Sequence, residues 1–213
     1  MTLPARINGW VRVVPAWPIY ILAVVNLLWE FWLALNGLRQ YAVEPINVLE
    51  RQYGEIALIM LIAGLFITPI RNWTGVNLVK YRRAIGLSAF LFVLAHFLVF
   101  AVLDVQSVSR VVTEVIKRPY VTVGFAAFVL LIPLAVTSNN RSIRKLGPVR
   151  WRKLHMLTYP IVVLSGLHYI WLVKGWPIEP FAYMVVILAL LFVRIKWTGI
   201  RDYLAKRDAS ASS

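Results

Sequence analysis

The sequence predicts an all-α membrane protein, a bundle of six transmembrane helices with both termini on the cytoplasmic side. Three observations support this prediction. Of the 213 residues, 60% are hydrophobic and only 15% are charged, whereas soluble domains carry about 25% charged residues. The apolar residues are gathered in six long runs, and the basic residues between these runs are distributed unequally.

Each apolar run approaches the length of about 20 residues that a helix needs to cross a bilayer. In chain order the runs cover residues 16–38, 54–70, 84–103, 121–137, 154–173 and 178–195. The first run is longer than the core of a signal peptide and lacks a small-residue cleavage site, so we expect a retained helix.

Aromatic residues, which favour the membrane interface, mark the ends of several runs. They are Trp17 and Tyr20 in the first run, Trp73 and Tyr81 around the second loop, Tyr120 before the fourth run, Trp151 before the fifth, and Trp171 and Trp176 around the fifth loop. Their positions support the boundaries of the predicted helices.

The basic residues predict the orientation of the chain. There are 23 Lys and Arg against 9 Asp and Glu, a net charge of +14. These charges lie between the apolar runs, so they indicate membrane topology and contact with anionic lipids rather than nucleic acid. The face that carries both termini has 17 of the 23, and the other face has 6. The positive-inside rule therefore places both termini in the cytoplasm.

We expect residues 1–208 to form a single transmembrane domain. The loops are short, and the sequence contains no GxGxxG motif, no Walker motif and no internal repeat. No nucleotide-binding domain is therefore predicted, so if the chain used electrons from NAD(P)H, a separate protein or a lipid-soluble quinol would have to deliver them. Residues 209–213, ASASS, predict a disordered tail or an appended remnant.

All three histidines lie in or at the edge of predicted spans, His96 in the third and both His155 and His168 in the fifth. An imidazole within lipid is a candidate functional group, and heme ligation is one such use. The alternative is an interhelical hydrogen bond. The absence of cysteine from the sequence excludes thiolate-ligated iron–sulfur clusters and covalently attached c-type heme.

His96 and His168 are predicted to lie at one depth in the membrane. At 1.5 Å per residue, His96 lies about 18 Å from the cytoplasmic start of its helix and His168 about 21 Å along its own. Two imidazoles from facing helices at one level can ligate a low-spin b-type heme that transfers electrons. Gly166, beside His168, is expected either to admit a porphyrin or to make an ordinary helix contact.

His155 is expected at a second level, about 20 Å from His168 and at the cytoplasmic edge. The matching position on the third helix is Arg83, which cannot ligate iron. His155 is therefore either a further heme ligand or a partner of a flavin, a heme propionate or the lipid headgroups. Arg82, Arg83 and Arg152 are candidate partners for the anionic propionates or a flavin phosphate at this level.

Glu30 lies in the middle of the first predicted span. A carboxylate in lipid costs on the order of a few kcal/mol unless it is protonated, paired or in contact with a polar cavity. We expect Glu30 either to couple protons to quinone chemistry or to make a hydrogen bond in helix packing.

Three segments resemble the MsrQ family, formerly YedZ, of the ferric-reductase-like transmembrane superfamily. They are YRRAIGLSAFLFVLAHFLVF at 81–100, GPVRWRKLHMLTY at 147–159 and ITPIR at 67–71. The resemblance covers essentially the whole chain. It implies a heme-bearing domain in the bacterial inner membrane, with the family's iron-ligand positions at His96, His155 and His168 and with FMN as a second cofactor.

The resemblance also implies that the chain is the electron-transfer subunit of a methionine sulfoxide reductase system. Electrons would come from the quinone pool or a cytosolic flavin reductase and pass to MsrP, a periplasmic molybdopterin enzyme that repairs oxidised envelope proteins. Catalysis would reside in that partner, so no catalytic residue is predicted in this chain.

The wider superfamily differs from this sequence in two respects. Its oxidases and metalloreductases carry four histidines and a fused flavin domain, whereas position 83 is arginine here and no fused domain is expected. Two alternative functions remain. One is a cytochrome b subunit of another periplasmic reductase, and the other is a small non-redox transporter whose histidines relay protons or pack helices.

Overall fold

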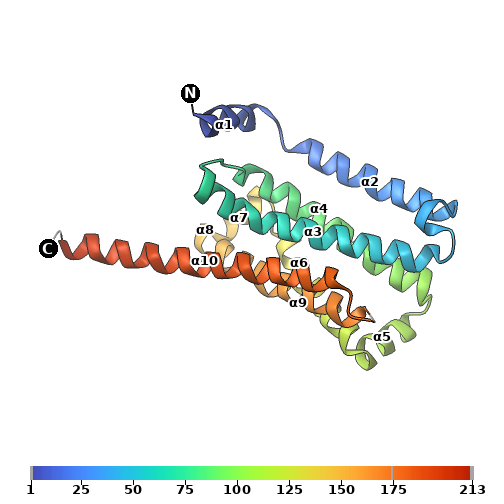
Figure 1. Cartoon of the computed structure of the whole chain (residues 1–213). Coiled ribbons are helices and arrows are strands. Elements are labelled where there is room, and N and C mark those ends of the chain that lie inside the picture. The colour runs from blue at the N-terminus through green and yellow to red at the C-terminus, as the bar shows by residue number, and fades with distance from the viewer. Residues whose placement is uncertain (1, 174, 212–213) are drawn as a thin grey trace.

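The described residues of the computed structural model, 2–173 and 175–211, form helices joined by short turns (Figure 1). Residues 195–211 are described by their backbone alone. Six long helices follow the order of the predicted runs: α2 (Trp17–Leu35), α3 (Pro45–Thr74), α4 (Arg82–Leu98) with its π-helical continuation η3 (Val99–Asp104), α6 (Pro119–Val136), α9 (Thr158–Leu172) and α10 (Ile178–Ala211). The prediction of an all-α fold is confirmed for this part of the chain.

Within the described residues, four helices are long and apolar enough to cross a membrane: Trp17–Leu35, Pro45–Thr74, Val79–Asp104 and Pro119–Val136. The fifth predicted span is shorter than expected, because a turn at Met156 and Leu157 separates α8 from α9, and α9 has 15 residues. The chain is thus a membrane protein with four candidate spans. Six crossings and cytoplasmic termini remain predictions.

Four shorter helices lie in segments that the sequence predicted as loops or tails, except that the last two residues of α8 belong to the fifth predicted span. They are α1 (Leu3–Val13), α5 (Val108–Lys117), α7 (Asn140–Leu146) and α8 (Pro148–His155). On α5, the exposed side chains of Val108, Val112 and Ile116 recur every four residues and form an apolar stripe, as in an amphipathic helix. This spacing is visible in the sequence and would have predicted α5.

The C-terminal helix α10 continues through Ala211. Residues 209–211 of the expected tail are therefore helical, and residues 212 and 213 lie outside the described part. In Figure 1, this end of α10 and the helix α1 lie at the same end of the bundle, and the α2–α3 connection and α5 lie at the other.

The helix α3 is central to the packing, because it contributes to both buried hydrophobic clusters. One cluster joins the first half of α3 to α2 and α4 through Leu49, Tyr53 and Ala57. The other joins it to α6, α9 and α10 through side chains that include Leu61 and Leu65. The helix α4 packs along α3, and α9 packs along α6. Two helix pairs therefore face each other across the bundle.

A proline inside α3 creates a second tie between α3 and α10. Pro69 has no N–H, so the carbonyl of Leu65 loses the donor that a regular helix would supply. Arg194 of α10 donates from Nη2 to this carbonyl at 2.9 Å and from Nη1 to Tyr159 Oη at 2.9 Å. The guanidinium therefore replaces the missing helical hydrogen bond and links α3, α9 and α10.

Candidate cofactor site

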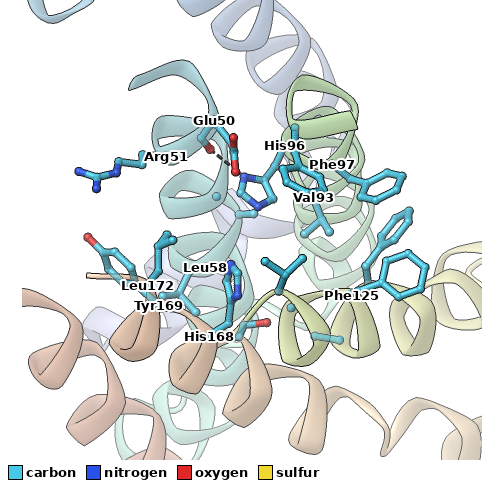
Figure 2. Close-up of a pocket in the computed structure, with 18 of the residues that line it drawn as sticks. Glu50, Arg51, Leu58, Val93, His96, Phe97, Phe125, His168, Tyr169 and Leu172 are labelled. Atoms are coloured by element: carbon cyan, nitrogen blue, oxygen red, sulfur yellow. Dashed lines mark hydrogen bonds between the residues drawn. The ribbon is translucent and has the colours of Figure 1, made fainter. Parts of the chain in front are cut away.

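A cavity of about 600 Å³ lies between the two helix pairs, at the end of the bundle where α3 begins and α5 lies (Figure 1). This volume is within the range of small-molecule and cofactor sites. Its walls are largely apolar, and the side chains that line it include Leu58, Val93, Phe97, Phe125 and Leu172 (Figure 2). Val115 of α5 also reaches the cavity.

His96 of α4 and His168 of α9 face each other across this cavity (Figure 2). Their ring centroids are 6.2 Å apart, and their planes are inclined by 77°. An iron atom between two imidazoles, about 2 Å from each ligating nitrogen, holds the ring centroids about 6 Å apart. The pair therefore fits the axial ligands of one heme, although they come from helices far apart in the sequence.

Hydrogen bonds to the main chain select the tautomer of both rings. His96 Nδ1 lies 2.8 Å from the carbonyl oxygen of Glu50, and His168 Nδ1 lies 2.7 Å from that of Tyr120. A carbonyl oxygen can only accept, so each Nδ1 carries the hydrogen. Each Nε2 then keeps a lone pair for a metal, and neither Nε2 has a hydrogen-bond partner among the described residues.

Two glycines make this approach possible, and sequence reasoning missed both. Gly54 and Gly124 each lie four residues after the carbonyl that a ring contacts. A Cβ at position 54 would lie 3.2 Å from His96 Nδ1, and one at position 124 would lie 2.7 Å from His168 Nδ1. We call each carbonyl and its following glycine a carbonyl–glycine unit. The signal in the sequence was a glycine inside an apolar helix, where this residue is unfavourable.

His155 lies apart from this pair and outside the cavity lining. Its Nε2 is 3.2 Å from Thr137 Oγ1, and the ring of Trp151 stacks on it with centroids 3.9 Å apart. Among the described residues there is no cluster of three or more His, Asp or Glu that could hold a metal ion. The structure thus brings two of the three histidines together, and a ligand role for the third remains a prediction.

The three arginines predicted to partner an anionic group do not line the cavity. Each donates to the protein instead: Arg82 to Thr68 Oγ1 at 2.6 Å, Arg83 to Asn140 Oδ1 at 2.8 Å, and Arg152 to the Pro148 carbonyl at 3.3 Å. Their binding of a flavin phosphate or a second cofactor stays a prediction.

Among the side chains that the structure describes, the arginines that do line the cavity are Arg51 and Arg118. Arg118 also forms an ion pair with Glu114 and donates to Tyr120 Oη at 3.0 Å. Both arginines are suited to carboxylates such as heme propionates. Sequence reasoning missed them because it searched the end that it predicted to be cytoplasmic, where basic residues are densest.

Gly166 packs against α10 and not against the cavity. A Cβ at this position would meet Met184 Cε at 2.9 Å and Ile187 Cδ1 at 3.1 Å. This position favours the ordinary helix contact over porphyrin approach.

Because Met184 is flexible, Gly166→Ala is expected to bind as much heme as the unaltered protein, at a small cost in stability. The measurement is the heme-to-protein ratio after purification. A clear loss of heme would mean that Gly166 contacts the cofactor after all.

Glu30 accepts a hydrogen bond of 2.7 Å from Tyr41 Oη. Tyr41 follows α2 in the short 3-10 segment Arg39–Tyr41 and is fully buried. Burial, together with the hydrogen bond to this carboxylate, raises the pKa of Tyr41 above its ordinary value. Of the two roles expected for Glu30, this contact favours a hydrogen bond in helix packing. The bond links the α2–α3 connection to α2.

Comparisons with known proteins identify the family of the chain. Residues 52–166, more than half of the chain, match the family described as "Ferric reductase like transmembrane component". Proteins of Brucella ovis, Brucella canis and Brucella melitensis, each named protein-methionine-sulfoxide reductase heme-binding subunit MsrQ, are 42% identical to the chain over 192 residues. The aligned region covers 90% of this chain and 84% of each relative. The chain therefore belongs to the MsrQ family of ferric-reductase-like transmembrane proteins.

Proposed function

We propose that this chain is a b-type cytochrome of the bacterial inner membrane that delivers electrons to a periplasmic methionine sulfoxide reductase, MsrP. The observation that carries the proposal is the pair of imidazoles of His96 and His168, 6.2 Å apart across the cavity. If both histidines held a heme, no position on its iron would remain for a small ligand, so the heme would supply electron transfer. The curated relatives are named heme-binding subunits of such a reductase.

The residues around the pair suit a bound heme. A bound heme would act as a one-electron carrier, and the cavity walls that would surround it include the aromatic side chains of Phe97 and Phe125. Arg51 and Arg118 line the cavity and would bind the heme propionates. Reduction of methionine sulfoxide takes place in the partner.

The direction of transfer follows from the orientation of the chain. The residues that line the cavity include the start of α3 and Val115 of α5. These elements lie at the end of the bundle opposite α1 and the end of α10 (Figure 1), which is the periplasmic side if both termini are cytoplasmic. Electrons leave there, near α5 and the α2–α3 connection. They arrive from quinol or a cytosolic flavin reductase at the other end, where His155 stacks on Trp151 and where FMN is expected as a second cofactor.

Absorption spectra of the detergent-purified protein, oxidised and then reduced with dithionite, test the proposal. A Soret band that shifts on reduction is expected. The reduced protein should then be reoxidised by purified MsrP and methionine sulfoxide. A colourless protein would favour a transporter, and a cytochrome that MsrP cannot reoxidise would favour another periplasmic reductase.

His155→Ala is expected to keep the heme content of the unaltered protein but to be reduced more slowly by its donor. The reason is that His155 lies outside the cavity and contacts Thr137 and Trp151. Heme content is measured as the pyridine hemochrome, and the reduction rate by stopped-flow absorption. The exposed neighbour Met156, changed to alanine, serves as the control. Loss of heme in His155→Ala alone would instead make His155 an iron ligand.

A further inference from the structure

We propose that the two carbonyl–glycine units are positioning elements that hold the imidazoles of His96 and His168 nearly perpendicular to each other. This inference rests on the proposed heme-binding function. It assigns a role to Gly54 and Gly124, which do not themselves touch the iron.

The hydrogen bonds fix the rotation of each ring. A ligand ring held only by its iron–nitrogen bond can turn about that bond, whereas a hydrogen bond from its other nitrogen fixes its plane. The bonds at Nδ1 measure 2.8 Å for His96 and 2.7 Å for His168. They end on different helices, α3 and α6, so the two planes are set independently. The resulting angle is 77°.

The two units have the same construction. The carbonyl of residue i in an α-helix already accepts the N–H of residue i+4. It can accept a second hydrogen bond through its other lone pair, but a ring can reach that lone pair only where residue i+4 leaves room. Glu50 with Gly54 and Tyr120 with Gly124 both have this spacing. In each case the unit is on the helix that packs along the ligand's own helix.

The angle between the rings determines the electronic state of ferric iron. Each imidazole plane interacts with one of two iron d orbitals of π symmetry. When the two ring planes are parallel, both rings raise the energy of the same d orbital, so the energies of the two orbitals differ. When the planes are perpendicular, each ring raises the energy of a different orbital, and the two energies stay nearly equal. Nearly equal energies give a strongly anisotropic low-spin signal in electron paramagnetic resonance, and separated energies give a rhombic three-line signal.

The oxidised, heme-loaded protein is therefore expected to show the strongly anisotropic signal. A rhombic signal from protein with full heme would overturn the positioning role and leave the proposed function intact. Protein without heme would overturn the proposed function itself. The two failures are therefore distinguishable in one sample.

The glycines are tested by substitution with alanine. In Gly124→Ala the new Cβ would lie 2.7 Å from His168 Nδ1, so the ring must leave the Tyr120 carbonyl and the signal must lose anisotropy. Gly54→Ala, with its contact at 3.2 Å, is expected to change the signal in the same direction by less and to keep its heme.

The matched control is Gly86→Ala on α4, where a Cβ would meet nothing within 4 Å. It should give the unaltered signal, and size-exclusion elution checks that every variant is folded. If Gly124→Ala is folded but loses its heme, the test depends on Gly54→Ala. A changed resonance signal in Gly54→Ala then supports the proposal. A signal that is unaltered in Gly54→Ala, and in Gly124→Ala wherever heme remains, overturns it.

Discussion

Replacing His168 with alanine is expected to abolish the Soret absorption of the purified protein. The side chain is one of only two imidazoles at the cavity, and its Nε2 is free to bind iron because Nδ1 donates to the Tyr120 carbonyl. Removing it leaves one axial position without a ligand, since the third histidine lies elsewhere and contacts Thr137. His96→Ala is expected to have the same effect. Heme is measured against protein after purification in detergent.

Replacing His168 with glycine distinguishes loss of the ligand from loss of the fold. His168→Gly leaves space that free imidazole can enter, so adding imidazole during heme loading is expected to restore the Soret band. Gly86→Ala, which alters a helix without touching the cavity, should be indistinguishable from the unaltered protein. Full heme in both alanine variants would rule out this ligand pair.

The second large effect is expected on stability, from Arg194→Ala. The substitution leaves the carbonyl of Leu65 without a donor inside the protein, because Pro69 has no N–H to offer. A buried carbonyl without a partner costs about 1–3 kcal/mol. Thermal unfolding, followed by tryptophan fluorescence in detergent, should show the variant unfolding at a clearly lower temperature. Arg83→Ala, an exposed arginine that donates to Asn140, is the control and should change little.

A double variant tests the cause directly. Pro69→Ala restores the N–H at position 69, so the carbonyl of Leu65 regains its helical hydrogen bond. In this background Arg194→Ala is expected to cost less than it does alone, and the difference measures the coupling between the two sites. An equal cost in both backgrounds would show that Arg194 stabilises the protein through its other contacts, which include Tyr159 and Thr68, and not through this carbonyl.

The helices and the histidine pair could be predicted because both depend on regular local geometry. A fixed rise per residue was enough to place His96 and His168 at one depth, and the structure brings their rings together. The carbonyl–glycine units could not be predicted in this way, since they depend on which face of α3 meets α4 and which face of α6 meets α9. Hydropathy also did not reveal the turn at Met156 and Leu157, because it interrupts the helix without interrupting the apolar run.

The arginine partners were predicted from the density of basic residues along the sequence. Whether an arginine reaches the cavity depends instead on its position in the folded protein. Basic residues that set topology gather on one face of a membrane protein, and Arg82, Arg83 and Arg152 belong to that face. Arg51 and Arg118 belong to the predicted face that has only 6 of the 23 basic residues, yet they line the cavity. A basic residue on the poorly charged face is therefore the more specific indicator of a site.

The apolar stripe of α5 has a practical consequence. Its outward side chains Val108, Val112 and Ile116 are exposed, while Val115 of the same helix forms part of the cavity wall. Such a helix is held flat by acyl chains beneath it. A small detergent micelle that fails to cover the stripe would release this wall, so nanodiscs are the better medium for preserving the native spectrum.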